Sequence, residues 1–194
     1  MYIDYTPEQK ALREELRSYF AKLLPPERRA GLRGMEGGPT FRETVRQMGR
    51  DGWLGVAWPR EYGGRGATLV EQVIYQEELA RSRAPGLAGH VGLQMVGPIL
   101  MEVGTEEQRK RFLPPILKGE EVWYQGFSEP NAGSDLARLQ TRAVADGDDW
   151  LVTGQKLWGG FAEFADWGAV LVRTDPDVPK HKGISFMVID MKAP

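Results

Sequence analysis

One helix-start signature occurs four times in the first 108 residues, and it constrains the fold more than any other feature of the chain. A threonine is followed three residues later by glutamate or glutamine, so that each side chain can bind the other's backbone N–H at a helix N-terminus. The four copies begin at Thr6, Thr40, Thr68 and Thr105. Such a repeated start signal predicts that the first two-thirds of the chain is helical.

The helical part contains one further predicted helix and a loop. A helix is predicted from about Val91 to Val103, with Gly104 ending it. The first helix should stop at Pro25-Pro26. Between the second and third signatures lies a Gly-rich loop that contains Trp53 and Trp58, and we interpret these aromatic residues as anchors packed between helices.

The pattern changes near Trp123, where short runs of β-forming residues begin to alternate with turns. The runs are Trp123–Phe127, Arg142–Ala145, Trp150–Val152, Ala169–Arg173 and Gly183–Asp190, with a hairpin turn at Asp146-Gly147-Asp148-Asp149. Because the helices precede the strands instead of alternating with them, the sequence predicts the α+β class with two modules. We place an all-α helical domain at residues 1–122 and a β domain at residues 123–194.

Composition excludes several functions. The 194 residues include no cysteine, which removes disulfides, thiolate nucleophiles and zinc–thiolate sites. His90 and His181 are too few and too far apart for a histidine metal site. The net charge of -2 gives no support to nucleic-acid binding. No apolar run approaches the ~18 residues of a membrane span, and Met1–Tyr5 lacks a leader pattern, so we expect a cytoplasmic protein.

The segment Gln125–Asp135 is the densest candidate for a binding site. It runs from a predicted strand into a loop of small and hydroxyl residues, in which Gly133 lets backbone N–H groups approach an anion. Ser128 and Ser134 add side-chain donors. From the residues alone, an ordinary turn and an anion-binding loop both remain open.

A second candidate is Gly154-Gln155-Lys156-Leu157-Trp158-Gly159-Gly160. It places the Trp158 indole beside two positions without side chains, an arrangement that suits a flat ring lying against exposed backbone. A β-bulge with a core tryptophan is the alternative.

Taken together, these segments make the sequence resemble the acyl-CoA dehydrogenase family over essentially the whole chain. The matching motifs, in the family's order, are Met48–Leu54, Trp58-Pro59 with Tyr62-Gly63-Gly64, Gly104–Gln108 with Phe112-Leu113-Pro114, Ser128–Asp135, Gly154–Trp158 and Lys182–Phe186. The opening Tyr5–Gln9 is most similar to the actinobacterial branch associated with sterol side chains and other bulky acyl-CoA substrates.

The resemblance implies an FAD enzyme that dehydrogenates the α and β carbons of an acyl-CoA thioester and passes electrons to an electron-transfer flavoprotein. It also implies an antiparallel β-barrel-like second domain, a further C-terminal helical domain outside these residues, and a homo- or hetero-oligomer. Carried over by motif, Gln125, Phe127 and Ser128 would border the flavin's pyrimidine edge. Ser134 and the Gly133 backbone would hold the FAD pyrophosphate near the pantetheine arm of the substrate.

Trp158, Gly159 and Gly160 would lie along the flavin, and His90 and Gln94 fall in the region that lines the family's acyl pocket. Gly160 departs from the family, which usually has a hydroxyl residue there that donates to flavin N5. The expected catalytic carboxylate belongs to the C-terminal region that these residues do not include, so we assign no catalytic residue and expect the isolated fragment to be inactive. A non-catalytic subunit of a heteromeric acyl-CoA dehydrogenase, or a flavin oxidase or monooxygenase on the same fold, are the alternatives.

Overall fold

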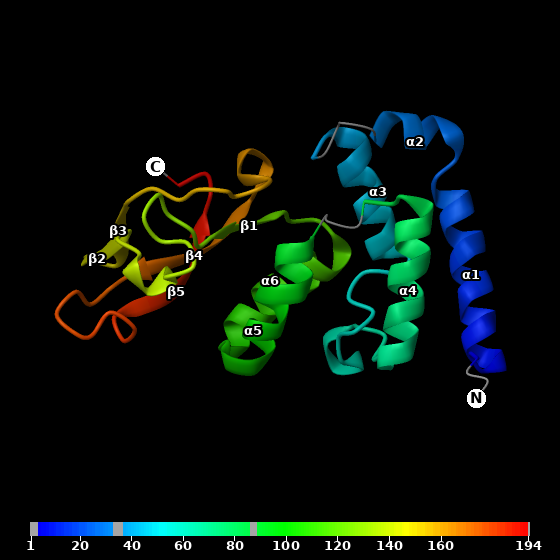
Figure 1. The fold of residues 1–194 in the computed structure, drawn as a ribbon, viewed down its shortest axis with the longest axis horizontal. Helices are drawn as coiled ribbons and strands as arrows, with labels where there is room; N and C mark the ends of the chain where they lie inside the picture. Colours follow the sequence, from blue (N-terminus) through cyan, green and yellow to red (C-terminus); the bar gives the residue numbers. More distant parts are fainter. Residues whose placement is uncertain (1–3, 33–36, 86–88, 194) are drawn as a thin grey trace. The chain divides into compact units, whose positions relative to one another are not determined.

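The computed structural model describes residues 4–32, 37–85 and 89–193. They form two compact units, Met1–Glu120 and Glu121–Pro194. The first three residues, which enter the argument about a leader, lie outside the described ranges. The predicted fold class, a helical domain followed by a β domain, is confirmed (Figure 1).

The helical unit contains α1 (Pro7–Leu23), α2 (Pro26–Leu32), α3 (Pro39–Arg50), α4 (Leu69–Ser82), the π-helix η2 (Val91–Val96), α5 (Gly97–Val103) and α6 (Glu106–Lys118). Three of the four predicted start signatures are confirmed as reciprocal capping boxes, at Thr6, Thr68 and Thr105. The prediction for Thr40 is wrong, because Gly38 is the extended N-cap and Pro39 takes the first helical position. Thr40 therefore lies inside the helix, where its carbonyl accepts a bond from the Thr44 hydroxyl.

Helix α1 packs along α4, and α6 packs against α3 and α5 (Figure 1). Leu16 and Phe20 of α1 and Ile74 of α4 are almost fully buried between them. The interpretation of Trp53 and Trp58 as packing anchors is confirmed, since each is 4% exposed. This packing fixes the loop between α3 and α4 over the helices.

The helix predicted over Val91–Val103 spans those residues but is not uniform. Its first part is the π-helix η2, in which the Gly97 N–H donates to the Gly92 carbonyl five residues earlier. Its second part is α5, which ends at Gly104 as predicted. No helix among the described residues is both long enough and apolar enough to span a bilayer.

The β unit is built on one five-stranded sheet. Its strands are β1 (Trp123–Gly126), β2 (Arg142–Asp146), β3 (Asp149–Thr153), β4 (Trp167–Arg173) and β5 (Ile184–Asp190). The sheet is mixed, whereas a wholly antiparallel one was expected: β4 pairs antiparallel with β5 but parallel with β1, in the register Trp123↔Trp167. The long connection from β1 to β4, which includes the β2–β3 hairpin, allows this parallel pairing. The hairpin turn itself is confirmed, with Asp146 opposite Asp149.

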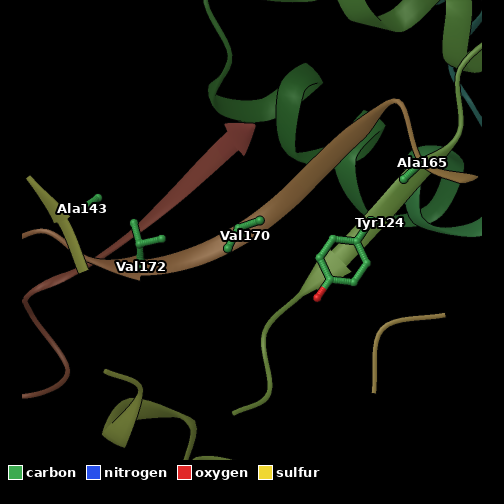
Figure 2. Close-up of a cluster of buried hydrophobic side chains, with 5 residues drawn as sticks. All are labelled: Tyr124, Ala143, Ala165, Val170 and Val172. Atoms are coloured by element: carbon green, nitrogen blue, oxygen red, sulfur yellow. The ribbon is translucent and has the colours of Figure 1, made fainter. Parts of the chain in front are cut away.

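A core cluster of the β unit lies along β1, β2 and β4 (Figure 2). Tyr124 of β1, Ala143 of β2 and Val170 and Val172 of β4 meet there, together with Ala165 just before β4. Tyr124 is therefore fixed on the strand that leads into the Gln125–Asp135 segment.

Candidate functional site

The two motif segments of the β unit lie against each other in the structure. The Leu157 N–H donates to the Ser128 carbonyl at 2.8 Å. The Lys156 ammonium donates to the Phe127 carbonyl at 3.2 Å and to Glu129 Oε1 at 2.8 Å. Three hydrogen bonds thus join two segments that lie nearly thirty residues apart in the sequence, and the segments form one site.

Glu129 is the acceptor that organises this site. Its carboxylate receives the backbone N–H groups of Gln140 and Thr141 at 2.6 and 2.9 Å and the Thr141 hydroxyl at 2.6 Å, besides Lys156. Burial by itself would raise the pKa of Glu129, but the bonds from Lys156, Thr141 and Gln140 outweigh it and hold the pKa at about 2. Glu129 is consequently an ionised structural acceptor that orients backbone.

The turn after Glu129 is tight and regular. Glu129 and Ala132 exchange backbone hydrogen bonds of 3.0 and 3.1 Å across Pro130 and Asn131. Proline presets the backbone at the first corner of such a turn. The chain then emerges into the exposed stretch Gly133–Asp135.

Trp158 is held in an unusual state. Its backbone is left-handed, with φ of 59°, and its side chain is 91% exposed. Both features are unfavourable for a large apolar residue, because the left-handed region crowds the side chain and the bare indole faces water. The alternative of a core tryptophan is therefore wrong, and the indole offers a free flat face.

The two glycines after Trp158 differ in surroundings. A Cβ at Gly159 would lie 1.8 Å from Cε2 of the Tyr124 ring, so close packing excludes a side chain there. A Cβ at Gly160 would meet nothing within 4 Å. Gly160 thus leaves open space beside the Trp158 segment, whereas Gly159 has a packing reason of its own.

The other residues predicted for this site lie on β1 and in the exposed loop. Gln125 and Phe127 are half-buried at the end of β1, next to Ser128. Gly133 and Ser134 are exposed, and a Cβ at Gly133 would also meet nothing within 4 Å. The neighbouring Asp135 carboxylate binds Lys180 at 2.9 Å, and this hydrogen bond lowers the pKa of Asp135. The loop can therefore present backbone and hydroxyl donors to an anion.

His90 and Gln94 lie together in the wall of a separate cavity in the helical unit. The cavity has a volume of about 880 Å³ and a largely apolar lining that includes Leu69, Val73 and Leu93. His90 and Gln94 are exposed side chains at the start and in the middle of the π-helical segment.

Trp58 was predicted as a packing anchor, but its role in supporting this wall was not predicted from the sequence. Trp58 donates from its indole N–H to the Leu93 carbonyl at 2.8 Å, and it also lines the cavity. Gly97 makes room for it, because a Cβ there would lie 2.1 Å from Cζ2 of Trp58. The pair of glycine and tryptophan was visible in the sequence, but their contact depends on the π-turn, which no local pattern indicated. Nowhere in the described ranges do three or more histidine and acidic side chains gather as a metal site would require.

These features define a class: a helical unit with an apolar cavity, followed by a β unit with a donor-rich loop and a bare indole. The family model described as the N-terminal domain of acyl-CoA dehydrogenase matches residues 6–120, and the model of the middle domain matches residues 125–194. The chain belongs to the acyl-CoA dehydrogenase family, and the resemblance found in the sequence is confirmed.

Three relatives illustrate the similarity. Acyl-CoA dehydrogenase FadE26 from Mycobacterium tuberculosis is 46% identical over 200 residues, which cover 100% of this chain and 50% of that protein. The crystal structure of the ChsE4-ChsE5 complex from the same organism is 47% identical with a TM-score of 0.91, covering 100% of this chain and 49% of that one. The Tcur3481-Tcur3483 steroid ACAD is 46% identical with a TM-score of 0.90, covering 100% and 50%. The chain thus spans about half the length of the relatives it matches.

Proposed function

We propose that the whole protein is an FAD-dependent acyl-CoA dehydrogenase and that this chain supplies part of its cofactor and acyl sites. The observation that carries the proposal is the exposed Trp158 indole, held on left-handed backbone and tied to the Ser128 segment. Family membership supports FAD as the flat-ring ligand, because acyl-CoA dehydrogenases use this cofactor. When bound, FAD accepts the hydride that leaves the β carbon.

The residues of the β unit fit such a ligand. The space at Gly133 and Gly160 is free of side chains, and the Ser134 hydroxyl is exposed beside Gly133. Gln125, Phe127 and Ser128 would border the pyrimidine edge of the flavin, and Ser134 with the Gly133 backbone would bind the pyrophosphate. Their task is to bind and orient the cofactor.

The cavity of the helical unit supports a bulky acyl substrate. Its volume of about 880 Å³ and apolar lining suit a large hydrocarbon group, with His90 and Gln94 as polar contacts in the wall. A related solved structure is a steroid ACAD, which favours a sterol-derived acyl-CoA over a short linear one. We propose that electrons leave to an electron-transfer flavoprotein, and that Ser134 also contacts the pantetheine arm.

Removal of the α proton needs a carboxylate within hydrogen-bond reach of the α carbon. Glu129 does not fit this role, because four donors keep its carboxylate ionised. Its side chain is also buried. Asp135 is paired with Lys180, and Glu163 is exposed in the short helix Ala162–Phe164. We therefore propose that the base comes from outside these residues, in the rest of the protein or in a partner subunit.

A second candidate is a subunit of a heteromeric dehydrogenase that shapes a site without completing it. Gly160 favours this candidate, because the position offers no side-chain donor to the flavin. The similarity to the ChsE4-ChsE5 complex, an assembly of two different subunits, also supports it.

The test is to purify the whole protein, alone and with any subunit that copurifies, and to measure bound flavin per complex. The proposed dehydrogenase should be yellow, release FAD on denaturation, and lose its flavin absorbance when a bulky acyl-CoA is added without oxygen. Fewer flavins than copies of this chain would favour the second candidate. A protein that takes up no FAD even in excess would refute the proposal of an FAD-dependent dehydrogenase.

A further inference from the structure

Lys156 joins the two segments of the candidate cofactor site. Its ammonium binds the Phe127 carbonyl at the end of β1 and the Glu129 carboxylate in the following turn. The side chains of Lys156 and Glu129 are only 8% and 7% exposed, so the pair is largely removed from water.

A buried ion pair is weak evidence for a stabilising role, because the cost of desolvating two charges offsets much of their attraction. What the pair does provide is a defined position. The ammonium bridges two acceptors on one segment while its own backbone belongs to the other, and the Leu157 N–H adds a bond to the Ser128 carbonyl at 2.8 Å.

The residue that follows these anchors is Trp158. Since its side chain is 91% exposed, core packing does not fix the indole, and its φ of 59° is a conformation that a tryptophan rarely adopts unless the neighbouring backbone is constrained. The constraint lies immediately before it, at Lys156 and Leu157, and immediately after it, at Gly159 against the Tyr124 ring.

We infer that Lys156 is a positioning residue: by binding Phe127 and Glu129 it fixes the backbone from which Trp158 projects, in register with the Ser128 loop. The cofactor part of this inference rests on the proposed function, whereas the ordering of Trp158 is a property of this chain alone. Lys156 acts through Trp158 and Ser128 and is not itself placed against the reacting atoms.

The first test uses the whole protein prepared without FAD and measures amide hydrogen exchange. Lys156→Met keeps a long unbranched side chain, one atom shorter than lysine, and removes its charge and donors. We expect exchange of the Leu157 amide, which donates to the Ser128 carbonyl, to rise by about tenfold or more, the factor that corresponds to losing one hydrogen bond to a charged group. Exchange in β4 should change by less than about twofold. Lys156→Arg retains charge and donors and should restore slow exchange.

A matched control is Lys192→Met, because Lys192 makes an exposed ion pair with Asp166 at 3.4 Å in the same unit. It should leave exchange of the Leu157 amide unchanged. If Lys156→Met instead raises exchange equally in β4 and at the Leu157 amide, or lowers only the melting temperature, Lys156 is merely structural and the inference is overturned.

The second test measures the dissociation constant of FAD and the fluorescence of the bound flavin. Lys156→Met should weaken FAD binding by about tenfold and raise flavin fluorescence, because a loosely held indole quenches less, while Lys156→Arg and Lys192→Met stay near the wild type. Unchanged affinity and fluorescence in Lys156→Met would overturn the cofactor part of the inference. A wild-type protein that binds no FAD would refute the proposed function, and the exchange measurement would still decide whether Lys156 orders Trp158.

Discussion

Replacing Glu129 by glutamine should lower the free energy of unfolding at neutral pH and should matter less as the pH falls. Four donors hold the carboxylate and lower its pKa from 4.5 to about 2. A group whose pKa is depressed in the folded state stabilises the fold at pH values above its ordinary pKa. That contribution is lost as the pH falls from 4.5 toward 2, because the unfolded chain binds the proton first.

The shift corresponds to about 3 kcal/mol of stability at neutral pH, at about 1.4 kcal/mol for each pH unit. Glu129→Gln should therefore be less stable than the wild type by about this amount at neutral pH. The difference in unfolding free energy between the wild type and Glu129→Gln should become steadily smaller below pH 4.5. Other carboxylates with lowered pKa values, such as Asp135, are present in both proteins and cancel in the comparison.

Urea unfolding followed by tryptophan fluorescence, at a series of pH values, gives this difference. A Thr141→Val variant removes the hydroxyl donor at 2.6 Å and keeps the carboxylate, so it should fold even if Glu129→Gln does not, and it should raise the pKa of Glu129. A stability difference that stays constant from neutral pH down to about pH 3 would refute the reasoning, since it would mean that Glu129 does not titrate with a depressed pKa.

Three further predictions concern a helix cap, the packing at Gly159 and the proposed flavin site. Thr68→Ala removes a confirmed capping box and should cost about 1 kcal/mol of unfolding free energy, whereas Thr40→Ala, inside its helix, should be near neutral; equal losses in urea unfolding would contradict the assignment. Gly159→Ala should destabilise the β unit by about 1–3 kcal/mol through its clash with Tyr124, and Gly160→Ala, with open space around it, is the control for thermal unfolding. Gly160→Ser should raise the rate of flavin reduction in stopped-flow assays of the whole protein by up to about tenfold, and an unchanged rate with unchanged FAD affinity would mean that backbone donors suffice.

Local signals in the sequence were sufficient for most elements. Capping boxes at Thr6, Thr68 and Thr105 located three helix starts, because the relevant hydrogen bonds close within four residues. The prediction of a helix start at Thr40 was wrong, because Gly38-Pro39 just before it provides a better N-cap and first helical residue. The threonine pattern alone does not rank competing N-caps. The hairpin at Asp146–Asp149 was likewise a local feature.

Features that depend on distant partners were not predictable in this way. The parallel pairing of β1 with β4 joins residues more than forty positions apart, and neither strand encodes its neighbour. The motifs around Ser128 and Trp158 could be found as candidates, but their contact through Lys156 and Glu129 needed the fold. The bonds that the Gln140 and Thr141 N–H groups donate to Glu129 likewise depend on the fold.

The π-helix between His90 and α5 forms part of the wall of the cavity in the helical unit. Each hydrogen-bonded turn of a π-helix contains one residue more than a turn of α-helix. Deleting one residue within Val91–Val96 would restore α-helical bonding, and the preceding residues, His90 among them, would keep nearly the same rotation relative to α5, because the π-turn absorbs the extra residue. Deletion of Leu93 or Gln94 would thus take one side chain out of the cavity wall while leaving His90 and the buried Leu100 of α5 in place. Length variation at this turn can therefore change the number of residues in the cavity wall, which point substitutions cannot do.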